Sequence, residues 1–209
     1  MEKGTLFWRI LKEYEDKSFR MKYLYTLYGF FISCLIMAQI LFPGGYSIKE
    51  YYISDQGSTT QNPAGCWFFI IGTAITSISL IPHLLYIHHK LMPRLAPLNF
   101  LMTLSGIIGC GGLFVVAVVP NSLPDLEHIH DWGANFAFGG LGLAAFFSFL
   151  IGVFRVFLKE EYPKILHFIG AYSLIIGVGL GLVLFTGTVQ QWFGLFTILV
   201  WGFLVPLIY

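Results

Sequence analysis

Two polar segments of this chain carry the residue types that could do chemistry. The first covers residues 51–65 and combines the carboxylate of Asp55 with hydroxyl, amide and glycine residues. The second covers residues 120–132 and places two histidines beside Asp131. Imidazoles and carboxylates act as general acids and bases, and both side chains also bind metals. The two segments therefore hold the candidate functional site.

The second segment predicts a stripe of polar side chains on one helix. If a helix begins near Ser122 and continues into the apolar residues beyond, His128, Asp131 and Asn135 stand at positions i, i+3 and i+7. Residues at this spacing share one helix face. Because lipid exposure of polar groups is costly, we expect the stripe to point into a helix bundle.

Three interpretations of these groups stay open. His128, His130 and Asp131 could bind zinc or another divalent metal that activates water, although residues 128 and 130 point apart on a helix. Alternatively, Asp55, His128 and Asp131 could act as catalytic acid and base on a lipid headgroup or ester. In the third interpretation the groups satisfy one another and cap helix ends, without any cofactor.

The first segment is a candidate for substrate binding. Its hydroxyls and amides could donate hydrogen bonds to a phosphate or sugar headgroup, and an ordinary turn-rich loop is the alternative. The candidate binding residues are Ser54, Gly57, Ser58, Asn62 and, from the second segment, Asn135.

The composition of the chain predicts a membrane protein. Of 209 residues, 56% are hydrophobic and 11% are charged, whereas a soluble domain carries about 25% charged residues. The surplus apolar side chains must face lipid. A net charge of +1 gives no field that would attract nucleic acid, so we expect membrane lipids as partners.

Six apolar stretches are long enough to cross a bilayer, which takes about 20 residues each. They cover residues 21–42, 66–89, 98–119, 133–158, 165–186 and 191–209. With six spans, eleven of the twelve Lys and Arg residues fall on one side, and Lys49 alone falls on the other. The positive-inside rule then places both termini in the cytoplasm and the two polar segments outside.

The sequence therefore predicts an all-α, six-helix bundle in the cell membrane. Residues 1–20 form a cytoplasmic or interfacial amphipathic segment, and residues 21–209 form a single transmembrane domain.

Glycines repeat within three of the predicted spans, where small residues let helix backbones approach closely. We expect tight packing of these helices, and the same faces would permit a homo-oligomer or a larger membrane complex. The repeats are Gly106, Gly109 and Gly112; Gly139 and Gly142; and Gly177 and Gly181.

The motifs of the two polar segments resemble those of a known superfamily. The first half runs from Tyr52-Ile-Ser-Asp through Gly57 and Asn62-Pro63 to Phe68 or Phe69. The second half combines a glycine-rich third span, Val119-Pro120, a short acidic stretch and His128. This pattern resembles the DRAM-like (damage-regulated autophagy modulator) six-helix membrane proteins, and is most similar to their prokaryotic members of unknown function.

The resemblance implies a six-span bundle and a lipid-related role, without a catalytic mechanism. It implies that the pattern depends on Ser54, Asp55, Gly57, Asn62, Pro63 and His128. Our leading hypothesis is a multi-pass membrane protein that binds or handles lipid at its outer face. The alternatives are a membrane-embedded hydrolase or transferase and an accessory subunit of a membrane complex. Because the spans carry almost no charge at mid-membrane, an ion pathway is poorly supported.

Overall fold

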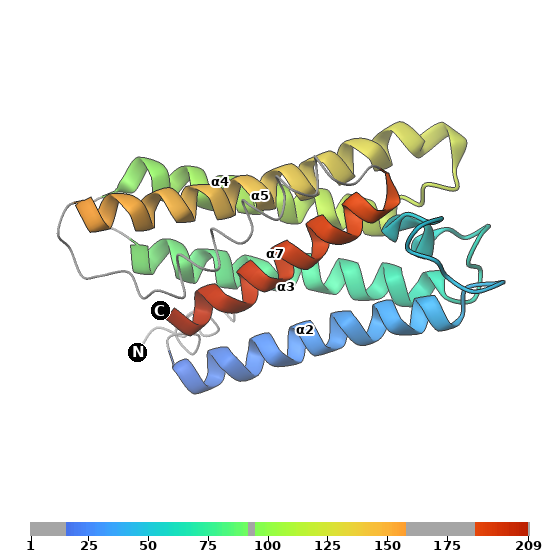
Figure 1. The fold of residues 1–209 in the computed structure, drawn as a ribbon, viewed down its shortest axis with the longest axis horizontal. Helices are drawn as coiled ribbons and strands as arrows, with labels where there is room; N and C mark the ends of the chain where they lie inside the picture. The colour runs from blue at the N-terminus through green and yellow to red at the C-terminus, as the bar shows by residue number, and fades with distance from the viewer. Residues whose placement is uncertain (1–15, 92–94, 158–186, 209) are drawn as a thin grey trace, which may run out of the picture.

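The computed structural model describes residues 16–91, 95–157 and 187–208. These residues form five long helices and two short 3-10 helices, with no strand among them. The long helices lie side by side along the long axis of the molecule (Figure 1). In chain order the elements are α2 (Lys17–Ile40), η1 (Ile53–Gly57), α3 (Cys66–Leu91), α4 (Ala96–Val118), η2 (Pro124–Leu126), α5 (Glu127–Phe157) and α7 (Thr188–Ile208).

The all-α class is confirmed, and four described helices are long and apolar enough to cross a membrane: α2, α3, α4 and α5. They coincide with the first four predicted spans, and α7 lies where the sixth was predicted. The fifth predicted span, 165–186, and most of the amphipathic segment 1–20 lie outside the described residues.

Two helices begin earlier than the apolar pattern predicts. α2 begins at Lys17, because the Asp16 carboxylate accepts a hydrogen bond from the Phe19 backbone N–H at 2.9 Å and caps the helix. α5 begins at Glu127, six residues before the predicted span, directly after η2. Polar first turns continue both helices beyond their apolar stretches.

Glycines hold α4 and α5 in the most extensive helix contact of the described fold. A Cβ added at Gly112 would lie 2.5 Å from the Ala137 backbone nitrogen, and one added at Gly140 would lie 2.5 Å from the Gly109 nitrogen. Tight packing of the third and fourth predicted spans is therefore confirmed.

Part of the predicted glycine pattern is wrong in detail. Nothing lies within 4 Å of a Cβ built at Gly139 or Gly142, and Gly133 and Gly140 make the close contacts on α5 instead. The pair Gly177 and Gly181 lies outside the described residues. Assembly with a second copy through glycine faces stays a prediction.

α7 packs more loosely, running obliquely across the other helices (Figure 1). It contacts α2, α5 and η1. Near its end, Gly202 faces the Tyr28 hydroxyl of α2 so closely that a Cβ there would collide with it. The Trp201 indole N–H donates to the Ser148 hydroxyl of α5 at 3.1 Å.

One of the basic residues that were predicted to lie on the cytoplasmic side is buried in the bundle. Arg20 is 1% exposed, and its guanidinium carbon lies 4.4 Å from the centre of the Tyr86 ring. This is cation–π geometry. Arg20 therefore belongs to the basic residues on the predicted cytoplasmic side, but its charge is not exposed to water.

Candidate functional site

The two polar segments meet at one end of the bundle. We call this region the polar cap and define it as residues 46–65 together with residues 119–123. It lies where α2 ends, α3 begins, α4 ends and α5 approaches through η2 (Figure 1). Sequence analysis predicted both segments as candidate site regions, and the structure joins them.

The Asp55 carboxylate connects the two segments of the polar cap by hydrogen bonds. Asp55 is 7% exposed, and its two carboxylate oxygens accept hydrogen bonds from different segments. Oδ2 accepts from the Tyr52 backbone N–H and Oδ1 accepts from the Asn121 side-chain amide, both at 2.6 Å. Hydrogen bonds to a charged acceptor are the stronger kind. The geometry gives Asp55 a positioning role in the cap.

A second link joins the same two segments. The Thr59 backbone N–H donates to the Ser122 hydroxyl at 3.3 Å, and the two side-chain hydroxyls lie 3.1 Å apart. Sequence analysis expected a helix to begin near Ser122, but η2 has Leu123 at its N-cap, with no side-chain bond there. Ser122 instead bonds to the opposite loop.

Three of the predicted binding residues are engaged inside the cap. Asn62 is fully buried: its amide donates to the carbonyls of Ala38 (3.0 Å) and Gln56 (2.9 Å), and its oxygen accepts from the Gly65 N–H. Ser58 accepts from the Gln61 N–H at 3.1 Å. A Cβ at Gly57 would lie 2.5 Å from the Phe69 ring. These residues shape the cap.

Tyr46 connects the polar cap to α7, a link that sequence analysis missed. Its hydroxyl donates to the carbonyls of Tyr51 and Tyr52 and accepts from the Trp192 indole N–H at 2.9 Å. Burial raises the pKa of Tyr46 to about 12; the hydrogen bond from Trp192 opposes this effect, and the Asp55 charge adds to it. Gln56 is fully buried, and its side-chain oxygen and nitrogen make no hydrogen bond with the residues that the structure describes.

The predicted polar stripe on α5 faces the surroundings. His128, Asp131 and Asn135 are all exposed, so the expectation that they point into the bundle is wrong. A stripe of buried positions sets the rotation of α5 instead: His130, Gly133, Ala137, Gly140 and Ala144. Close packing against α4 needs small residues inward, and that requirement determines which polar side chains turn outward.

His130 is the buried histidine of this turn. It is 3% exposed, and its Nδ1 lies 2.6 Å from the Val119 carbonyl oxygen. Nowhere in the described part of the chain do three or more His, Cys, Asp or Glu side chains gather as metal ligands. The proposed ligands His128, His130 and Asp131 do not converge there. A catalytic role for Asp55, His128 and Asp131 stays a prediction.

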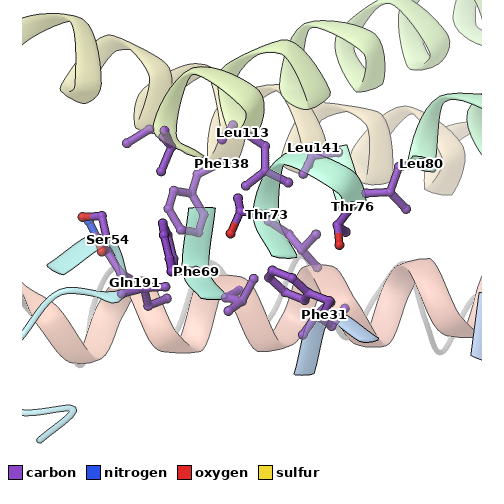
Figure 2. A pocket seen from close by; sticks show the side chains of 17 residues that line it. Phe31, Ser54, Phe69, Thr73, Thr76, Leu80, Leu113, Phe138, Leu141 and Gln191 are labelled. Atoms are coloured by element: carbon purple, nitrogen blue, oxygen red, sulfur yellow. The ribbon is translucent and has the colours of Figure 1, made fainter. Parts of the chain in front are cut away.

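A cavity of about 70 Å³ lies directly beneath the polar cap, inside the bundle (Figure 2). Residues of α2, α3, α4, α5, α7 and η1 line it. Ser54 and Gln191 lie together at one end, and Thr76 and Leu80 lie toward the other. Sequence analysis predicted Ser54 as a binding residue but had no signal for Gln191 or for the cavity.

Apolar side chains make up most of the cavity wall, among them Phe31, Val116 and Leu141. Besides Ser54 and Gln191, two further polar residues, Thr73 and Thr76 of α3, line the cavity. An apolar space with a few polar groups is typical of a site for an apolar ligand.

Comparison with known proteins identifies a family of unknown function. Residues 28–208 match the family described as "Protein of unknown function (DUF998)", an uncharacterised family of membrane type. No curated protein and no solved structure matches the chain. The family match gives no specific link to the DRAM-like superfamily, so that resemblance stays a prediction.

Proposed function

The chain belongs to this family of unknown function, and we propose that it binds a membrane lipid beneath the polar cap. Part of one apolar chain of the lipid occupies the cavity, and its headgroup lies at the Ser54 and Gln191 end. The observation that carries this proposal is the cavity itself, which has a polar end and an apolar body inside a bundle of membrane-type helices.

An amphiphile fits this space better than water does. A volume of about 70 Å³ exceeds the roughly 10–15 Å³ that a single water requires, and apolar cavities tend to stay dry. The headgroup end offers the hydroxyl of Ser54 and the amide of Gln191, which can bond to phosphate or ester oxygens.

The arrangement of the helices supports the six-span topology that we propose for the chain. α5 ends at the end of the bundle opposite the polar cap, and α7 begins at the cap (Figure 1). The fifth predicted span, 165–186, lies outside the described residues, and a crossing there would complete six. α2 begins and α7 ends on the same side, as the prediction of two cytoplasmic termini requires.

With that orientation the polar cap lies on the outer face of the cell membrane. The proposal treats residues 21–209 as one transmembrane domain and residues 1–20 as an interfacial segment. Within the cap, Ser54 contacts the headgroup, while Asp55 and Asn62 position the loops over the cavity. The exposed stripe of His128, Asp131 and Asn135 stands apart from this site.

A matched pair of valines on α4 tests the proposal. Val116 lines the cavity and is 8% exposed, whereas Val118 on the same helix is 48% exposed and faces outward. Val116→Phe places a ring in the cavity, and Val118→Phe adds the same bulk outside it. Lipid bound to each purified, detergent-washed protein is counted by native mass spectrometry.

We expect one lipid on most copies of the wild type and of Val118→Phe, and loss of most of that lipid from Val116→Phe. Thermal unfolding confirms that each variant is folded. A folded Val116→Phe protein that retains the same lipid as the wild type would reject the cavity as the binding site.

A further inference from the structure

We infer that Thr73 and Thr76 donate hydrogen bonds to an acyl-ester carbonyl of the bound lipid, and so select ester-linked over ether-linked chains. This inference rests on the proposed function and names the chemical class of its ligand. It adds a specificity determinant that neither polar segment contains, since both threonines lie within α3.

The two hydroxyls are buried donors that face the cavity. Thr73 is 1% exposed and Thr76 is 2% exposed, and both line the cavity. Neither hydroxyl has a hydrogen-bond partner among the described residues. Figure 2 shows both side chains on one face of α3, between the α5 side chains Phe138 and Leu141 and the helix α7.

Other hydroxyls within the helices behave differently. Ser77 donates to the Ala74 carbonyl at 2.7 Å, Thr103 to the Asn99 carbonyl at 2.9 Å, and Ser148 to the Ala145 carbonyl at 2.8 Å. Such bonds to a preceding turn are the usual way in which a buried helix satisfies Ser and Thr. Because buried polar groups are nearly always bonded, the two unpartnered hydroxyls point to a ligand atom.

The depth of the threonines matches the position of a lipid ester. Phe69 of α3 packs against Gly57 of the cap, and Thr73 and Thr76 follow it by four and seven residues. At 1.5 Å per residue they lie about 6 to 11 Å below that contact. In a lipid the ester carbonyl comes directly after the headgroup, so a headgroup at Ser54 and Gln191 brings it to the threonines.

The chemistry of the two groups is complementary. A carbonyl oxygen has two lone pairs and no proton, so it can accept a bond from each hydroxyl. In an alkyl-ether lipid a methylene group stands in place of the carbonyl, so the acceptor that the two hydroxyls need is absent. The cavity volume of about 70 Å³ accommodates only the first part of one chain beside the ester carbonyl.

A pair of single-chain lipids tests the inference directly. The delipidated protein is titrated with a monoacyl lysophosphatidylcholine and with its alkyl-ether analogue of equal chain length. We expect the wild type to bind the ester roughly tenfold to a hundredfold more tightly, the combined effect of two buried hydrogen bonds. The double variant Thr73→Val with Thr76→Val keeps the side-chain shape and removes both hydroxyls.

In the double variant, ester affinity should fall to the ether level while ether affinity stays unchanged. Thr197→Val is the control, because the Thr197 hydroxyl already donates to the Phe193 carbonyl at 3.0 Å; it should retain the preference for the ester. Equal binding of ester and ether by the wild type would overturn the inference and leave the proposed function standing.

Two other results would also be decisive. If the double variant weakens both ligands by the same factor, the threonines contribute packing alone, and the inference is wrong. If neither lipid binds the wild type and purified protein retains none, the proposed function itself fails, and the inference fails with it.

Discussion

The α4–α5 contact and the α7 side of the bundle are built in opposite ways. Between α4 and α5, glycines bring the backbones so close that a single added methyl group would collide with backbone atoms. Around α7, larger side chains such as Phe31 and Leu195 meet with a cavity between them. Both regions lie in the same membrane-type bundle, so the lipid environment does not cause the difference.

The difference suggests a division of roles. Backbone contact leaves no room for a ligand and holds two helices in one register, since close packing tolerates little change in volume. The looser side keeps space and two unpartnered hydroxyls. The polar cap joins the two sides, because Asp55 bonds to the loop after α4 and Tyr46 bonds to α7.

The largest expected effect comes from a variant that disrupts the close contact between α4 and α5. A Cβ at Gly112 would lie 2.5 Å from the Ala137 nitrogen, whereas one at Gly111 meets nothing within 4 Å. Gly112→Ala should destabilise the fold by about 2 kcal/mol or more, as overpacking does. Gly111→Ala should stabilise it by up to about 1 kcal/mol through helix propensity. Chemical unfolding in detergent measures both, and equal effects would contradict the packing account.

The next effect disconnects the two loops of the cap. Asp55→Asn replaces one acceptor oxygen with a donor and removes the charge that Asn121 and the Tyr52 N–H bond to. We expect a loss of about 1.5 to 3 kcal/mol, the contribution of a hydrogen bond to a charged group. Glu50→Gln, at an exposed position of the same loop, serves as the control. An unchanged unfolding free energy in Asp55→Asn would show that the carboxylate is not structural.

A smaller effect loosens the link between the cap and α7. Tyr46→Phe removes the hydroxyl that accepts from Trp192 and should cost about 1 kcal/mol at neutral pH. Tyr25→Phe, at a side chain that is 53% exposed, is the matched control.

The pH dependence of this pair adds a second test. The folded pKa of Tyr46 is about 12, above the value of about 10 in an unfolded chain. Between these values the unfolded state loses the phenol proton first, so stability falls as pH rises. The advantage of the wild type over Tyr46→Phe should be complete below pH 10 and shrink above it. A constant difference across that range would contradict the buried position of the hydroxyl.

The smallest expected change in stability comes from a variant at the cavity beside α7. Val116→Phe adds bulk where the cavity can accept it, so we expect less than about 1.5 kcal/mol of destabilisation. Unfolding of Val116→Phe beside Val118→Phe measures this. A loss as large as that of Gly112→Ala would mean that both sides of the bundle are equally tight.

The sequence was sufficient to locate the described long helices, and less so their contacts. Apolar length located α2 to α5, and the two polar segments were recognised as one site region. The rotation of α5 was predicted wrongly, because the polar stripe at His128 was weighed above the small residues around Gly133 that pack inward.

Contacts between residues far apart in the sequence could not be predicted, because no short segment of the sequence indicates them. The bond between Tyr46 and Trp192 joins residues 146 positions apart. The cavity exists because side chains from five long helices fail to fill one space, and no single segment encodes that outcome. Thr73 and Thr76 look like ordinary helix residues until their partners are sought.

Photo-crosslinking tests the central claim most directly. A phospholipid with a photoreactive group on the first part of its acyl chain is bound to the protein, illuminated, and mapped by peptide mass spectrometry. We predict labelling of cavity residues, above all Thr76, Val116 and Leu195, in excess over the outward-facing Ile75 and Val118. Labelling confined to the outward-facing residues would contradict a lipid site within the bundle.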